Sequence, residues 1–460
     1  MESLFKVRVN WSVLLGAAIF ILLLNPDMSW YSFLAILISL HQLLLLFYSI
    51  NTVIPIRYLA GTLMCLQMFI GPALAYNGLD QYQYFAYRMQ IPEAQYFAYV
   101  IPAVVCFILG LHINAGKLKG EMLNEKGIKI FIDQHKNLPY LLIGIGFISS
   151  IVSIYFSSDL AFVFYLLGGF KFIGVFMLVL SNRQLKLVPL VIVFSSIIIS
   201  SLGEGMFHDL LTWLIMLGAV LGIKYKPGVN LKIIVCVSFI FLSVIIQQLK
   251  GSYRTATGQG EAAGLETFQK VYEANNDQNS LFSFASLAGS NVRINQGFII
   301  TNIMKTVPAR VPFSDGVELS QILESAILPR IIAPNKLNAG DRDIFKKYSG
   351  VNLRQGTTMA LSSVGDGYIN FGEAGGCIFM FVLGLFFSEV LNIFYKKSKT
   401  SPILLLFAPL VFYYPIRPDC ELQTILGHLI KSCFLIFVIF IIWKREFTLG
   451  LTTTWKRLSY

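Results

Sequence analysis

Charged side chains are scarce in this sequence, and their scarcity excludes an ordinary soluble protein. Only 13% of the 460 residues are Asp, Glu, Lys or Arg, whereas 55% are hydrophobic. Soluble chains carry roughly 25% charged residues. Apolar runs long enough to cross about 30 Å of hydrocarbon recur along the chain. The sequence therefore predicts an all-α, polytopic membrane protein.

Familiar catalytic and metal-binding motifs are also missing. The six cysteines have no spacing typical of disulfides or metal sites, and the five histidines are scattered. The sequence contains no Walker A, HExxH or GxSxG motif. Gly365-Asp366-Gly367 is not a dinucleotide-binding fingerprint, because no βαβ unit surrounds it. We therefore expect chemistry that uses neither a cofactor nor a bound metal.

Twelve apolar segments are candidates for membrane spans. The first ends in Asn25-Pro26-Asp27 without a small-residue cleavage pattern, so we expect a retained span rather than a signal peptide. Segments 210–223 and 402–414 are short for a full crossing, so one of them could be re-entrant. The twelve segments are 11–24, 30–50, 58–76, 96–113, 138–156, 161–180, 188–202, 210–223, 233–249, 377–394, 402–414 and 425–443.

The basic residues between these segments predict the orientation. Lys and Arg concentrate in alternate connections, which are then cytoplasmic, and the short connections on the other side hold only Arg88 and Arg417. Both termini are expected in the cytoplasm. The predicted domains are nine spans in 1–249, an external basic loop in 250–371, and three spans with a cytoplasmic tail in 372–460. The net charge of +11 comes from these connections and this loop, so it does not indicate a nucleic-acid partner.

The predicted external loop keeps many basic residues on the side of the membrane where they are usually few. From Arg293 to Arg354 it has nine Lys or Arg against five acids. The guanidinium group suits phosphate oxygens, so an anionic ligand at the membrane surface explains the set better than solvated surface charge. For any single arginine, solvated surface charge is an equal alternative. The candidate diphosphate-binding residues are Arg330, Arg293 and Arg354, followed by Arg254, Lys336 and Arg342.

Hydrophobic spacing indicates that this loop is partly helical. Apolar residues recur at helical spacing from 317 to 327, and shorter helices are expected at 267–275, 294–305 and 341–348. We expect these helices to pack on the membrane domain as a cap. Within the glycine-rich run 362–376, Gly365-Asp366-Gly367 considered alone favours a flexible turn that leads into the next span.

Two further residues stand near the predicted outer end of span 188–202. Glu204 and His208 are four positions apart, so they share one face if the chain is helical there. An ordinary polar connection between spans is an equal alternative.

The motifs of the polar segment resemble those of the bacterial O-antigen polymerases, which are Wzy-type polymerases of oligosaccharide repeat units. Pro329-Arg330 followed by Pro334-Asn335-Lys336 is similar to the Pro-Arg and Pro-x-Lys pairs of that family. The run 365–375 resembles its stretch of small residues, an acid, Tyr, Asn, Phe and Gly. Relatives commonly have Glu where this chain has Asp366. The resemblance in architecture covers nearly the whole chain, and the motifs cover about 293–376.

This resemblance implies a reaction and a place. A growing glycan would be transferred from undecaprenyl diphosphate to the non-reducing end of a lipid-linked repeat unit, at the outer face of the bacterial inner membrane. Arginines would stabilise the departing diphosphate without a metal. An acid or histidine would take the proton of the acceptor hydroxyl, and the candidates are Asp366, Glu373, His208 and Glu204.

The implied partners are the bilayer and the lipid-linked oligosaccharide, and the resemblance also allows a protein that regulates chain length. Three alternatives stay open at this point. The first is an enzyme of similar architecture, such as an O-antigen ligase or a peptidoglycan-type polymerase. The second is a lipid-linked oligosaccharide flippase or another transporter. The third is a structural or regulatory membrane protein, which leaves the external arginines unexplained.

Overall fold

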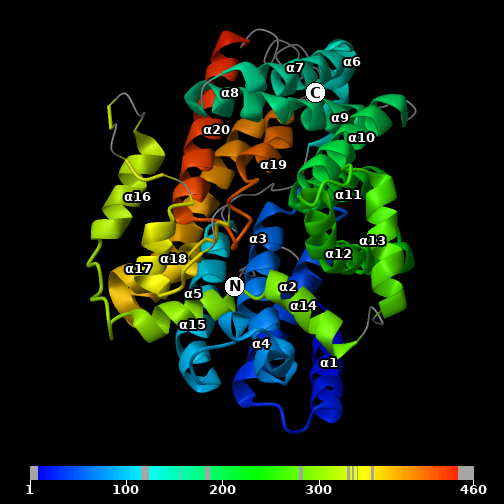
Figure 1. The fold of residues 1–460 in the computed structure, drawn as a ribbon. Coiled ribbons are helices and arrows are strands. Elements are labelled where there is room, and N and C mark those ends of the chain that lie inside the picture. Colours follow the sequence, from blue (N-terminus) through cyan, green and yellow to red (C-terminus); the bar gives the residue numbers. More distant parts are fainter. Residues whose placement is uncertain are drawn as a thin grey trace.

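In the part of the chain that the structure describes, all of the regular secondary structure is helical (Figure 1). The computed structural model describes residues 9–115, 124–156, 158–181, 187–278, 283–328, 332–333, 336–338, 340–353 and 357–443. These residues contain no β-strand. A helix satisfies its own backbone hydrogen bonds, which an apolar segment in hydrocarbon requires. The predicted all-α fold class is confirmed.

The helices follow one another with short connections. The membrane-type helices of the first half are α1 (Trp11–Leu24), α2 (Trp30–Ser49), α3 (Ile56–Cys65), η1 (Leu66–Ile70), α4 (Gly71–Tyr76), α5 (Glu93–His112), α7 (Leu138–Val152), α8 (Ser158–Gly168), α9 (Phe170–Leu180), α10 (Leu187–Glu204), α11 (His208–Tyr225) and α12 (Val229–Gly258). Shorter pieces between them are η2 (Leu79–Tyr82), η3 (Phe85–Tyr87), α6 (Glu125–Gln134) and η5 (Ser153–Tyr155). The second half contains α13 (Leu265–Gln278), α14 (Phe284–Ile294), α15 (Gly297–Thr306), α16 (Val317–Ile327), α17 (Arg342–Ser349), α18 (Ser362–Ser398), η6 (Pro402–Phe407), α19 (Ala408–Val411) and α20 (Leu422–Ile442).

All twelve predicted apolar segments coincide with helices. In the described part of the chain, ten helices are long and apolar enough to cross a membrane, which is typical of a multi-pass membrane protein. The remaining two, Trp11–Leu24 and Pro402–Val411, are apolar but shorter. Many of the long helices expose Leu, Ile, Val and Phe side chains on one side, as lipid-facing helices do.

The polar segment after α12 is helical, as predicted. Helix α16 occupies 317–327, and α13, α15 and α17 overlap the three shorter predicted helices. Helix α14 was not predicted. α16 packs on α20, and α15 packs on α17 and α18 (Figure 1). These helices therefore cover the ends of α18 and α20 rather than form a fold of their own.

Helices α5 and α18 make the closest helix pair of the core. A Cβ added to Gly110 would lie 2.3 Å from the carbonyl oxygen of Phe381, and one on Gly384 would lie 2.2 Å from that of Phe107. Only glycine allows two helix backbones to approach so closely, which is how membrane helices gain packing contacts. The Tyr99 hydroxyl adds a hydrogen bond of 2.7 Å to the carbonyl of Val364.

The glycine-rich run is helical, so the expectation of a flexible turn is wrong. Ser362 begins the helix with a φ of 66°, the residues after it are helical, and inside the helix the backbone departs from helical geometry at Gly372, where φ is 67°. That value suits glycine, because it lies in the left-handed region. The break divides α18 into a short polar part with Asp366 and a long apolar part. It coincides with the predicted boundary between the loop and the last spans.

The chain between α18 and α20 is irregular and almost completely buried. It consists of η6, α19 and turns, and residues 401–413 are buried without a break. Irregular backbone at membrane depth is tolerated only where protein covers it. Nε2 of His428 lies 2.7 Å from the carbonyl oxygen of Leu410. This contact gives a hydrogen-bond partner to one backbone carbonyl of the irregular chain. His428 is therefore a structural histidine.

Candidate functional site

Four basic side chains from three separate segments come together around Lys250. Lys250 interacts electrostatically with Arg254, one turn further along α12, and with Arg293 in the last turn of α14. It also interacts with Arg417, in the loop before α20. Helix α14 packs against α12 and α4, which brings these segments together (Figure 1). We call Lys250, Arg254, Arg293 and Arg417 the cationic cluster.

One carboxylate accompanies the cationic cluster. Asp419 Oδ2 lies 3.3 Å from Nη2 of Arg417, and Asp419 Oδ1 accepts a hydrogen bond from Nε2 of Gln67 at 3.5 Å. Burial alone raises the pKa of Asp419, but the neighbouring Arg417 and Gln67 outweigh it and hold that pKa below its usual range. Among the described residues, no acid forms an ion pair with Lys250, Arg254 or Arg293.

Gln67 lies on an unusual turn of its helix. Residues Leu66–Ile70 form a π-helical segment within the span Ile56–Tyr76. π-Helical turns occur frequently at functional sites, because the extra residue releases a backbone group and redirects a side chain. Here the carbonyl of Gln67 accepts a hydrogen bond from the backbone N–H of Gln296 at 3.1 Å. The π-turn thus holds the start of α15 with its backbone and Asp419 with its side chain.

The cationic cluster repels itself in the absence of an anion. Arg254 and Arg293 are exposed, so water screens part of this repulsion, whereas Lys250 is partly buried. Four cations against two carboxylates, Asp419 and Asp209, leave an excess of positive charge. Arg417 is largely buried, and its Nη1 has no hydrogen-bond partner within the described part of the chain. The arrangement therefore favours a ligand with several negative charges.

Two of the predicted bases lie beside this cluster. A Cβ added to Gly205, which lies between Glu204 and His208, would be 2.8 Å from Cγ of Arg254. His208 Nε2 lies 2.5 Å from Oδ1 of Asp209, and Asp209 in turn interacts with Arg417. Glu204 is exposed on the adjoining turn and accepts a hydrogen bond of 3.4 Å from a serine of its own helix. The structure thus brings His208 and Glu204 near Arg254, one of the predicted diphosphate ligands, and links His208 through Asp209 to Arg417, which was not predicted.

The other two predicted bases lie elsewhere. Glu373 is exposed, directly after the break at Gly372. Asp366 is only 7% exposed and lines a cavity of about 50 Å³ on the other side of the loop that carries Arg417. Three further acids line the same cavity, namely Glu318, Asp341 and Glu421. We call this cavity the acidic pocket.

The asparagine of the glycine-rich run joins the walls of the acidic pocket. Asn370 Oδ1 accepts hydrogen bonds from the Ser314 hydroxyl at 2.7 Å and from the Leu319 N–H at 3.0 Å. Its amide donates to the backbone carbonyl of Asp366 at 2.8 Å. Asn370 therefore ties the start of α16 to α18 and fixes the turn on which Asp366 stands.

The remaining predicted ligands are outside the cationic cluster or outside the described residues. Lys336 donates to the carbonyls of Ser325 and Leu328 at 3.2 and 2.6 Å, and these contacts stabilise the C-terminal end of α16. Arg342 is exposed on the first turn of α17. Arg330 and Arg354 lie outside the described residues.

Sequence reasoning missed half of the cationic cluster. Lys250 and Arg417 were not candidates, although Arg417 stood out as a basic residue in a short external connection. Asp419 and Glu421 were passed over because nothing in the sequence relates residues 417–421 to the polar segment. In the part of the chain that the structure describes, no group of three or more His, Cys, Asp or Glu is arranged to hold a metal ion.

Comparison with known proteins places the chain in a family. Residues 22–394 match the model described as Domain of unknown function (DUF8712). The chain belongs to this family. The DUF8712 match includes Lys250, Arg254, Arg293 and Asp366, and it ends before Arg417. No curated protein and no solved structure matches the chain.

Proposed function

We propose that this protein is a polysaccharide polymerase that binds a polyprenyl diphosphate at the cationic cluster. The observation that carries the proposal is the meeting of Lys250, Arg254, Arg293 and Arg417 with Asp419 as the only paired acid among the described residues. A diphosphate carries the several negative charges that this cluster favours, and guanidinium groups suit its oxygens. The lipid part of such a ligand would remain between apolar helices.

The reaction is the transfer of a growing glycan to a lipid-linked repeat unit. The acceptor hydroxyl oxygen bonds to the anomeric carbon of the donor, and the bond from that carbon to the diphosphate oxygen breaks. The diphosphate leaves with the electron pair, and its growing charge is stabilised by the cationic cluster. His208 takes the hydroxyl proton, and Asp209 stabilises the imidazolium that forms. The donor is already activated, so this step needs no nucleotide.

The proposed location is the outer face of the bacterial plasma membrane. Placing both termini in the cytoplasm follows from the bias of Lys and Arg among the connections. It puts the segment from Lys250 to Phe371, and with it the cationic cluster, on the outer side. The proposed substrates are undecaprenyl diphosphate-linked glycans that present their sugars at that face.

Purified full-length protein in nanodiscs gives a direct test with undecaprenyl diphosphate as the probe. Loss of a charge-assisted hydrogen bond costs about 1.5–3 kcal/mol, so Arg254→Ala and Arg293→Ala should each weaken binding by about 10- to 100-fold. Arg310 is exposed and outside the cluster, so Arg310→Ala is a matched control that should change binding less than twofold. Equal affinity of Arg254→Ala, Arg293→Ala and the wild type would refute the site.

The product distribution in cells separates the polymerase from its alternatives. A polymerase null strain should carry lipid A core capped with a single repeat unit. A ligase null strain should show no capping at all. Accumulation of repeat units on the cytoplasmic face would instead indicate a flippase.

A further inference from the structure

The diphosphate proposal leaves the acidic pocket without a role. Its cavity of about 50 Å³ has room for one or two ordered waters or the edge of a small ring. The walls come from α16, α17, α18 and the start of α20. Besides four acids, they include the amides Asn338 and Gln423 and the aromatic residues Phe345 and Tyr348.

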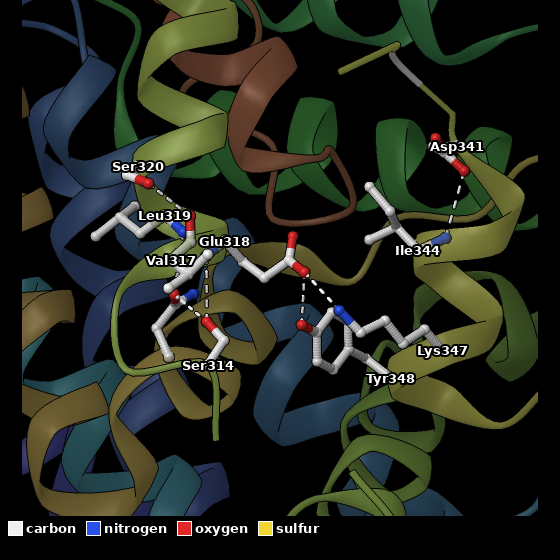
Figure 2. A network of polar contacts seen from close by, with 10 residues as sticks. Ser314, Val317, Glu318, Leu319, Ser320, Asp341, Ile344, Lys347 and Tyr348 are labelled. Atoms are coloured by element: carbon white, nitrogen blue, oxygen red, sulfur yellow. Dashed lines mark hydrogen bonds and ion pairs between the residues drawn. The ribbon is translucent and has the colours of Figure 1, made fainter. Parts of the chain in front are cut away.

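Three of the four acids already have hydrogen-bond donors from the protein. Glu318 lies 2.8 Å from Nζ of Lys347 and accepts a hydrogen bond of 2.6 Å from the Tyr348 hydroxyl, as Figure 2 shows. Asp341 accepts from the first backbone N–H groups of α17. Glu421 accepts twice from the N–H of Gly340, at 3.1 and 2.9 Å. Hydrogen bonds from the protein therefore fix the positions of these three acids, and they do not need a bound cation for partners.

Asp366 differs from these three. It is more than nine-tenths buried and lines the cavity, and the N–H of Leu422 is directed at its carboxylate. Among the described residues, no side chain donates a hydrogen bond to it. Burial penalises the charged form of this carboxyl, so a ligand hydroxyl group that can accept a hydrogen bond from it or donate one to it would stabilise it.

The side-chain amide of Gln423, also in the pocket wall, has no N–H left to donate to a ligand. Both hydrogens of the Gln423 amide are used, on the Ser325 hydroxyl at 2.6 Å and on the carbonyl of Leu337 at 2.8 Å. What this side chain can still offer is its acceptor oxygen. A fitting ligand must therefore provide several O–H donors and an apolar edge that can lie on Tyr348 and Phe345. Those are the properties of a sugar ring.

We propose that the acidic pocket binds the hydroxyl groups of a neutral saccharide, namely the acceptor end of the repeat unit. The identification of this saccharide as the acceptor rests on the proposed function. Its binding to the acidic pocket does not. The cavity takes one edge of the ring, and the rest of the saccharide lies at its open mouth. Asp366 and Glu421 form hydrogen bonds with its hydroxyl groups.

The position of the acidic pocket relative to the cationic cluster supports this assignment. Arg417 and Glu421 are four residues apart. A fully extended chain of that length spans at most about 14 Å. Arg417 belongs to the cationic cluster and Glu421 to the acidic pocket. A diphosphate at one and a saccharide at the other would be separated by about the length of a few sugar rings, which is the spacing that a glycan transfer between them needs.

Binding of a sugar without lipid or phosphate provides the test. The probe is the free repeat-unit oligosaccharide, released by mild acid from the lipid-linked intermediates of the source cells. Saturation-transfer NMR with the full-length protein in nanodiscs should detect it. Asp366→Asn and Glu421→Gln should each weaken its binding by about tenfold or more. Glu324 is an exposed acid on α16, so Glu324→Gln is the matched control and should bind like the wild type.

A second probe separates this inference from the proposed function. Undecaprenyl diphosphate without sugar should bind Asp366→Asn and Glu421→Gln as it binds the wild type. Absent oligosaccharide binding, or binding that both substitutions leave unchanged, would overturn the pocket assignment whether or not the lipid binds. Oligosaccharide binding that depends on Asp366, with no lipid binding, would overturn the proposed function alone. Should either substitution prevent folding, Met359→Trp tests the same cavity by filling it.

Discussion

The crossing of α5 and α18 allows a test in which one type of substitution has opposite effects at two positions. A Cβ on Gly384 would lie 2.2 Å from the carbonyl oxygen of Phe107. That is about 1 Å closer than ordinary contact, and backbone atoms cannot rotate away, so the two helices have to separate. Gly144 on α7 has nothing within 4 Å of its added Cβ. The same change there creates no clash.

The expected magnitudes follow from these distances. Overpacking a core costs about 1–3 kcal/mol, and alanine in place of a helical glycine returns about 1 kcal/mol. Gly384→Ala should therefore destabilise the protein by about 1–2 kcal/mol. Gly144→Ala should leave its stability unchanged or raise it by up to about 1 kcal/mol.

The assay is the fraction of protein that remains monodisperse on size-exclusion chromatography after heating in one detergent. We expect a lower midpoint temperature for Gly384→Ala than for the wild type, and an equal or higher one for Gly144→Ala. Since α18 carries Asp366, the first variant should also lose polymer formation below its midpoint. A Gly384→Ala protein as stable as the wild type would show that α5 and α18 do not approach as described.

Two further predictions concern the walls of the acidic pocket. Asn370→Ala leaves the buried N–H of Leu319 without its acceptor and should lower the free energy of unfolding by about 1–3 kcal/mol; Asn302→Ala, whose amide only returns to its own helix, should cost less in the same heating assay. Burial raises the pKa of Glu421 above its ordinary value of 4.5. The charge of Asp341 adds to this shift, and the hydrogen bond from the N–H of Gly340 opposes it. A raised pKa means that the folded protein favours the protonated carboxyl, so this contribution to stability is complete below pH 4.5 and is lost as the pH rises through the folded-state pKa. The difference in midpoint between the wild type and Glu421→Gln should therefore change across that pH range, and a constant difference would contradict it.

The membrane helices could be predicted from the sequence because hydrophobicity and length decide them. All twelve apolar segments are helical, and the amphipathic spacing around Ile322 was sufficient to place α16 at 317–327. The glycine-rich run shows the limit of such reasoning. Glycine favours turns in isolation, but here packing against Tyr99 on α5 and the hydrogen bonds of Asn370 hold 362–371 in a helix. Tertiary contacts override the local preference.

The candidate site could be predicted only in part, because its residues meet through the fold. Arg254 and Arg293 were candidates for their charge alone, and nothing in the sequence places Lys250 and Arg417 beside them. Arg57 illustrates the opposite error. It is one of the basic residues in the alternate connections that were predicted to be cytoplasmic. It is nevertheless only 3% exposed and donates hydrogen bonds to Ser388 and to the carbonyl of Leu111. A charge at the end of a span can equally be a packing residue.

The irregular segment before α20 explains why a cationic and an acidic site can lie so close together. In a regular helix, residues 417, 419 and 421 would be spread around the axis at fixed angles of about 100° per residue. Here the chain is non-helical from 412 to 421, so Arg417 and Asp419 meet Lys250 and Gln67 while Glu421 meets Gly340. Just before this segment, the carbonyl oxygen of Leu410 lies 2.7 Å from Nε2 of His428, a contact that holds the irregular chain against α20. The irregular backbone of this one short loop therefore lets it contribute Arg417 and Asp419 to the cationic cluster and Glu421 to the acidic pocket.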